Sequence, residues 1–135
     1  MGIERRLNNR VSQVLNTNFL IIDKMTHGML DAQDVLKFRD GQLINFSSTG
    51  ISMKTWDIID RWVPFLKSGD LRIGIQFQFV FEARPICAIT KVMWIRKITP
   101  QKKHYLLGLK FMDISTLDLI KVRKYVIGNN ARNKK

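Results

Sequence analysis

The sequence predicts an all-β domain: a small antiparallel barrel of six or seven strands, followed by a C-terminal α-helix. Two observations carry this prediction. Between residues 71 and 82, apolar side chains occupy every second position, which is the pattern of a strand with one buried face. The other strand-like segments are short and closely spaced, and they do not alternate with helices. A parallel α/β fold is therefore disfavoured, and 135 residues fit one domain.

The predicted strands follow one another with short connections. Strands are expected at residues 11–25, 35–38, 43–46, 51–53, 71–82, 86–98 and 105–111. The pair Asp40-Gly41 favours the type I′ turn that matches strand twist, so the second and third of these segments are expected to form a hairpin around it.

Two segments depart from the strand pattern. Residues 54–68 carry apolar side chains at helical spacing and predict a short helix, with Trp56 and Trp62 covering the core. Residues 115–118 have the composition of a helix cap, and apolar residues at helical spacing follow them. We expect this C-terminal helix to lie against the barrel and to end at Gly128.

The chain is expected to have three parts. Residues 1–10 are polar and basic and predict a flexible arm that carries arginines, residues 11–128 form the barrel and its helix, and residues 129–135 predict a basic disordered tail. The lone cysteine, Cys87, is expected to be a small buried apolar residue. No signal peptide and no stretch of membrane-spanning length is visible, which indicates a cytoplasmic protein.

The net charge of +12, from 23 Lys and Arg against 11 Asp and Glu, indicates a polyanionic partner: a nucleotide, a nucleic acid or an anionic membrane. Catalysis is not indicated, because the sequence has no phosphate-binding loop, nucleophile elbow or His-Glu-x-x-His motif. The two histidines and one cysteine do not form a zinc-site pattern either. We therefore expect a binding protein without metal or cofactor.

Two short stretches supply the candidate binding residues. Asn45 and Ser47 are two positions apart, so on a strand their side chains point to one face, and Gly50 permits a sharp turn or a close approach. Arg6 and Arg10 share a face near the start of the chain, and guanidinium groups can meet phosphate or a guanine edge bidentately. Each stretch alone also has an ordinary interpretation, as a Ser turn and as a solvated basic arm.

Together, these stretches resemble the R-x-x-x-R and [D/N]-x-S-x-x-G motifs of PilZ domains, and the resemblance extends from Glu4 to Gly128. Two further segments, Val92-Met93-Trp94 and Gly108-Leu109-Lys110-Phe111, resemble the family's Val-x-Trp and Gly-x-Lys/Arg-Phe strands. The resemblance implies a PilZ-like barrel and a receptor for cyclic di-GMP. Such a receptor would relay the signal from its arm to an unidentified downstream protein in motility, biofilm or exopolysaccharide control.

The resemblance also implies roles for individual residues. Arg6 and Arg10 would meet phosphates and guanine edges, while Asn45 and Ser47 would hydrogen-bond a guanine and Gly50 would give access to the backbone. Asn45 stands where Asp is commoner in the family, which removes one possible ionic contact to the ligand.

Two more residues complete the candidate site. Trp94 is a candidate stacking surface for a base, with a core position as the alternative, because it is expected to face away from Met93 and Ile95. Arg5 adds a third guanidinium, which fits an intercalated dimer of cyclic di-GMP better than a single molecule.

An alternative function is a barrel that binds single-stranded nucleic acid. Residues 83–112 contain no acidic side chain and several Lys and Arg, and a basic barrel can hold single strands. A third interpretation is a PilZ-like scaffold that binds another protein and no nucleotide, and the complete motifs weigh against it.

Overall fold

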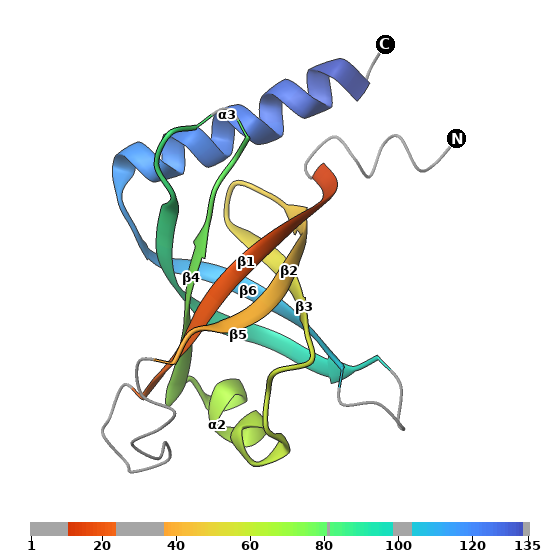
Figure 1. The fold of residues 1–135 in the computed structure, drawn as a ribbon, viewed down its shortest axis with the longest axis vertical. Helices are drawn as coiled ribbons and strands as arrows, with labels where there is room; N and C mark the ends of the chain where they lie inside the picture. The colour runs from red at the N-terminus through yellow and green to blue at the C-terminus, as the bar shows by residue number, and fades with distance from the viewer. Residues whose placement is uncertain (1–10, 24–36, 81, 99–103, 134–135) are drawn as a thin grey trace.

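The computed structural model describes residues 11–23, 37–80, 82–98 and 104–133 (Figure 1). Six antiparallel strands close into a barrel in the order β1-β2-β3-β6-β5-β4. The strands are β1 (Val11–Asp23), β2 (Arg39–Phe46), β3 (Gly50–Thr55), β4 (Leu71–Phe77), β5 (Ile86–Lys97) and β6 (Tyr105–Ile114). A 3-10 turn, η2 (Asp60–Trp62), and α2 (Val63–Ser68) lie at one end, and α3 (Thr116–Asn133) crosses the other (Figure 1). The predicted all-β barrel with a C-terminal helix is confirmed.

The interior of the barrel is filled by the alternate side chains that the sequence pattern indicated. In β4, the odd-numbered residues from Leu71 to Phe77 are buried, and Phe79 continues the pattern beyond the strand. The strand is shorter than predicted, because the chain turns after Phe77 and the Glu82 N–H donates to the Phe79 carbonyl at 3.0 Å. Phe81 lies outside the described residues.

The predicted hairpin turn at Asp40-Gly41 is wrong. Both residues lie within β2 and pair with β1. A type I′ turn needs positive φ at both central residues, and among the described residues Gly69 is the only glycine with positive φ. The glycine at position 41 serves packing instead, because a Cβ there would lie 3.0 Å from the Sδ atom of Met53.

Cys87 is exposed, contrary to the expectation that it is buried. It lies in β5 between Ile86 and Ala88, which both face the core. Because successive side chains on a strand point to opposite faces, the residue between two core residues must point outward.

The short helical segment predicted over residues 54–68 is confirmed in its second half. Pro64 stands in the first turn of α2, where the absence of its N–H costs no hydrogen bond, and Gly69 ends the helix with φ of 88°. Trp62 is buried, as predicted. Trp56 is 48% exposed, so its predicted core position is wrong; it follows β3 on the outer surface and its ring centroid lies 6.3 Å from that of His104.

Polar side chains close the same end of the barrel around Trp62. The Arg39 guanidinium is buried, lies 4.6 Å from the Trp62 ring centroid and pairs with the Asp57 carboxylate at 2.8 Å. The Tyr105 hydroxyl donates a hydrogen bond to Asp60. Burial, and secondly this carboxylate, raise the pKa of Tyr105 to about 12. Because its ordinary value is 10, stability due to this group falls only as the pH rises from 10 towards 12.

The C-terminal helix begins as predicted. The Ser115 hydroxyl accepts a hydrogen bond from the Asp118 N–H at 3.1 Å, which caps the first turn. Val122 and Val126 are buried against the barrel, and the Tyr125 ring stacks on Phe79 with centroids 4.1 Å apart.

The predicted end of this helix is wrong. α3 continues through Gly128 to Asn133, so residues 129–133 are helical and do not form a disordered tail. A glycine inside a helix costs about 1 kcal/mol relative to alanine and does not by itself end the helix. None of the helices in the described parts of the chain is both long and apolar enough to cross a membrane.

Candidate functional site

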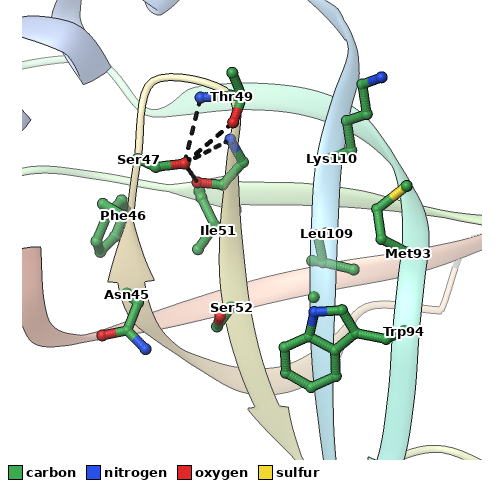
Figure 2. Close-up of a pocket in the computed structure, with 12 residues that line it drawn as sticks. Asn45, Phe46, Ser47, Thr49, Ile51, Ser52, Met93, Trp94, Leu109 and Lys110 are labelled. Carbon is green, nitrogen blue, oxygen red and sulfur yellow. Dashed lines mark hydrogen bonds between the residues drawn. The ribbon is translucent and has the colours of Figure 1, made fainter. Parts of the chain in front are cut away.

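A shallow cavity of about 500 Å³ opens on the outer wall of the barrel, over β2, β3, β6 and β5 (Figure 2). Four of the sequence-predicted site residues, Asn45, Ser47, Gly50 and Trp94, line it together. The three arginines of the predicted site, Arg5, Arg6 and Arg10, lie outside the described residues. The described chain starts at Val11, and the first residues of β1 pair with the end of β2, directly beside this cavity.

The centre of the cavity is a row of four residues that are paired across neighbouring strands. Asn45 of β2 pairs with Ser52 of β3, Ser52 pairs with Gly108 of β6, and Gly108 pairs with Trp94 of β5. Figure 2 shows the Asn45, Ser52 and Trp94 side chains on the same side of the wall. We call these four residues the cross-strand row. It presents an amide, a hydroxyl, a bare stretch of backbone and an indole.

A bulge in β2 places Asn45 on the outer face. The register shifts between Leu43 and Asn45, and Leu43 and Phe46 both face the core although they are three positions apart. An extra residue in one strand reverses the alternation beyond it, so Ile44 and Asn45 both turn away from the interior.

A second bulge, in β5, does the same for Trp94. The register shifts between Val92 and Trp94, so Met93 and Trp94 both point outward, with 57% and 43% of their surfaces exposed. The expectation that Trp94 faces away from Met93 is therefore wrong, whereas its opposition to the buried Ile95 is confirmed. The exposure of Trp94 decides between its two predicted positions: it belongs to the outer wall and not to the core.

The Trp94 ring packs against Gly108, which has no side chain to displace it. A Cβ at position 108 would clash with the indole nitrogen of Trp94, so the ring lies directly over the Gly108 backbone. The Arg96 guanidinium lies 5.5 Å from the Trp94 ring centroid. Because this guanidinium lies over the ring, a purine that stacks on the indole would contact the cation or displace it.

Ser47 organises the turn between β2 and β3. Its hydroxyl accepts hydrogen bonds from the N–H groups of Gly50 at 3.1 Å and Thr49 at 3.3 Å. The same hydroxyl donates a hydrogen bond to the Gly50 carbonyl oxygen at 3.1 Å (Figure 2). The Phe111 N–H donates to the Thr49 carbonyl at 3.0 Å and ties the turn to β6. The structure thus shows the Ser turn that was the ordinary interpretation of this motif.

A glycine is required at position 50 because the backbone of the neighbouring strand β6 approaches it closely. It has no positive φ and pairs with Lys110 at the start of β3. A Cβ at position 50 would overlap the carbonyl oxygen of Leu109 and lie 3.1 Å from its carbonyl carbon. Access to the Gly50 backbone for a ligand stays a prediction.

The structure adds site residues that the sequence prediction did not include. Ser52 lies at the centre of the cross-strand row, and Met93 and the exposed Lys110 line the same cavity. The alternation of buried Ile51 and Met53 around Ser52 was the available signal for its outward position. Among the described residues, no group of three His, Cys, Asp or Glu side chains could hold a metal ion.

Comparisons with known proteins give no relative by sequence. No family model matches the chain, and no curated protein gives a significant match. Solved structures do match. The Bacillus subtilis inhibitor of motility has a TM-score of 0.66 at 17% identity, over 94% of this chain and 52% of its own. The PilZ domain of YcgR from Escherichia coli, solved with c-di-GMP, has a TM-score of 0.55 at 12% identity over 93% and 92%.

A third structure, the PlzA protein of Borreliella burgdorferi in complex with c-di-GMP, has a TM-score of 0.52 at 15% identity, over all of this chain and 51% of its own. The molecule is therefore a small β-barrel domain with a cavity on its outer wall. More particularly, it has the PilZ-domain fold. The chain spans about half the length of the inhibitor of motility and of PlzA.

Proposed function

We propose that this chain is a receptor domain for cyclic di-GMP, which binds over the cross-strand row. The observation that carries the proposal is the row itself: one outward amide, Asn45, and one outward indole, Trp94, joined across Ser52 and Gly108. A guanine offers a flat face for the indole and a hydrogen-bonding edge for the amide. Lys110, exposed at the same cavity, supplies a cation for a phosphate.

The fold supports this ligand. By their names, two of the structures that share the fold are complexes with c-di-GMP, the PilZ domain of YcgR and PlzA. The match to the inhibitor of motility also motivates the broader proposal that the domain acts in motility control through a partner protein.

The arginine arm would complete the site. Arg10 directly precedes β1, in which Val11 pairs with Phe46 and Ser12 pairs with Asn45, so the chain reaches β1 next to the cross-strand row. We propose that Arg6 and Arg10 clamp the ligand and that binding changes the state of residues 1–10. Charge-assisted hydrogen bonds contribute roughly 1.5–3 kcal/mol each, so several can offset the ordering of the arm. Hydrogen exchange over residues 1–10 tests this change of state: exchange should be fast without ligand and slow with it.

Calorimetric titration with cyclic di-GMP tests the proposal. Arg6→Ala and Arg10→Ala are each expected to weaken binding at least tenfold, about 1.4 kcal/mol, because each removes a bidentate donor to phosphate or guanine. The thermal midpoint of the unliganded protein should not fall. Arg61→Ala is the matched control, since Arg61 is exposed at the opposite, α2, end of the barrel. Unchanged affinity in both arm variants would overturn the site assignment.

The same titration measures stoichiometry. With Arg5, the arm offers three guanidinium groups, more than the two phosphates of one cyclic di-GMP need, and an intercalated ligand dimer would use the third. We expect an endpoint near two ligands per chain, and Arg5→Leu should shift it towards one while binding persists. If the unaltered chain already takes one ligand and Arg5→Leu leaves that endpoint in place, the dimer proposal fails.

Binding of single-stranded nucleic acid is the rival outcome. Three of the cations in residues 83–112 would contact the nucleic acid: Lys97, Lys102 and Lys103. Lys97 lies 3.3 Å from the Asp60 carboxylate, and Lys102 and Lys103 lie outside the described residues. If nucleic acid is the ligand, affinity for a mixed oligonucleotide should fall linearly with log salt and should survive Arg6→Ala.

A further inference from the structure

The helix α3 has two apolar stripes on opposite sides. One faces the barrel and contains the buried Val122 and Val126. The other contains Leu117, Ile120 and Ile127, which are 69%, 41% and 67% exposed. We call these three residues, with the exposed Lys124 between them, the outer stripe. Figure 1 shows α3 lying across the end of the barrel, so that its far side faces away from the strands.

The spacing of the outer stripe is that of a helix-packing seam. Its four members, Leu117, Ile120, Lys124 and Ile127, follow one another at intervals of three, four and three residues. This is the a–d spacing of a heptad, which keeps a narrow row of side chains against one facing helix. A stripe one side chain wide with a lysine near its centre is poorly suited to a lipid surface, where an interfacial helix presents a broad apolar face.

The charges beside the outer stripe select the chemistry of the partner. Arg123 and Lys124 are exposed. The acidic Asp118 is engaged towards the barrel, where its carboxylate lies 3.5 Å from the Cys87 N–H, and Lys121 lies 3.8 Å from the Glu82 carboxylate. A facing helix with Asp or Glu at the flanking positions would meet these cations favourably, whereas a second copy of α3 would oppose them with like charges.

We propose that the outer stripe of α3 is a docking surface for an amphipathic helix of a partner protein, with aliphatic residues in its seam and acidic residues beside it. The proposal rests on α3 alone and does not depend on the ligand of the cavity. A lysine in the seam would set the register of the complex, because only one alignment places an acidic residue against Lys124.

A designed peptide tests this surface. The probe has about three heptads with Leu and Ile in the seam, Glu at the flanking positions and Glu opposite Lys124, and the comparison peptide has Lys in place of every Glu. The full chain is expected to bind the acidic peptide at least tenfold more tightly than the basic one. The double variant Ile120→Gln/Ile127→Gln should lose at least tenfold in affinity, and Lys124→Glu should reduce the preference for the acidic peptide.

Two controls separate docking from general effects. Ile59→Gln changes an isoleucine that is 40% exposed and lies before η2 at the other end of the barrel, so it should leave peptide binding intact. Cyclic di-GMP titration of the α3 variants should match that of the unaltered chain, which keeps a failure here distinct from a failure of the proposed function.

Three results would overturn the proposal. The first is no measurable binding of either peptide, or binding that Ile120→Gln/Ile127→Gln leaves unchanged. The second is self-association of the chain in sedimentation that this double variant abolishes, which would identify a second copy as the occupant. The third is binding to vesicles containing anionic lipid that the same variant abolishes while the acidic peptide fails to bind.

Discussion

Replacing Trp62 with alanine is expected to lower the free energy of unfolding by about 3–5 kcal/mol. The side chain is 1% exposed in the structure and projects from the last residue of η2 into the end of the barrel. Its loss leaves a cavity and also removes the aromatic face that lies 4.6 Å from the buried Arg39 guanidinium. A cation–π contact of a desolvated cation contributes about 2 kcal/mol, so the two effects act in the same direction. Denaturant unfolding measures the change.

Two variants make this prediction specific. Trp56→Ala removes the same side chain from a position that is 48% exposed and should cost far less. Trp62→Phe keeps an aromatic ring and removes an indole N–H that has no hydrogen-bond partner among the described residues, so it should be milder than Trp62→Ala. Equal losses for Trp56→Ala and Trp62→Ala would show that Trp62 does not hold this end of the barrel.

Gly50→Ala is expected to destabilise the fold by about 3 kcal/mol, at the upper end of the usual cost of overpacking. The added methyl group would overlap the Leu109 carbonyl oxygen, which belongs to the backbone of β6 and cannot rotate away as a side chain can. Relief requires β3 and β6 to separate where Gly50 pairs with Lys110, next to the turn that Ser47 holds. The thermal midpoint and the affinity for the cavity ligand should both fall.

Gly128→Ala is the matched control for Gly50→Ala. It makes the same substitution within α3, where a Cβ would meet no atom within 4 Å, and alanine favours the helix by about 1 kcal/mol. Stability should therefore rise slightly at position 128 and fall at position 50. A neutral result for Gly50→Ala would mean that the strands adjust without cost.

The sequence predicted those features that depend on local periodicity. The alternation in β4 follows directly from one buried face, and the residues from Leu71 to Phe77 have it in the structure. Asn45 and Ser47 both line one cavity, but β2 ends at Phe46, so Ser47 lies in the turn and not on the strand as expected. Their role in binding a ligand stays a prediction. The arginine half of the motif lies outside the described residues, so its part in the site stays a prediction.

The bulges explain what could not be predicted. Each adds one residue to a strand, at Ile44 and at Met93, and reverses the in–out pattern beyond it without any change in composition that marks the position. Counting alternate residues therefore misplaced Met93 relative to Trp94. Asp40-Gly41 failed for another reason: the pair permits a tight turn but does not require one, and pairing with β1 kept it extended.

The closed ring of six strands limits how this domain can meet other molecules. In the described part of the barrel each strand pairs with two neighbours, although β4 covers β1 only from Asn18 to Asp23 and β5 only from Ile86 to Thr90. No strand is therefore an open edge along its whole length. Recruitment of a partner by adding a strand is thereby disfavoured, as is the edge-to-edge stacking that leads to aggregation. Recognition has to be made by side chains that project from the wall and the ends. The bulges at Ile44 and Met93 are two of the places where the backbone of this closed barrel changes which side chains point outward.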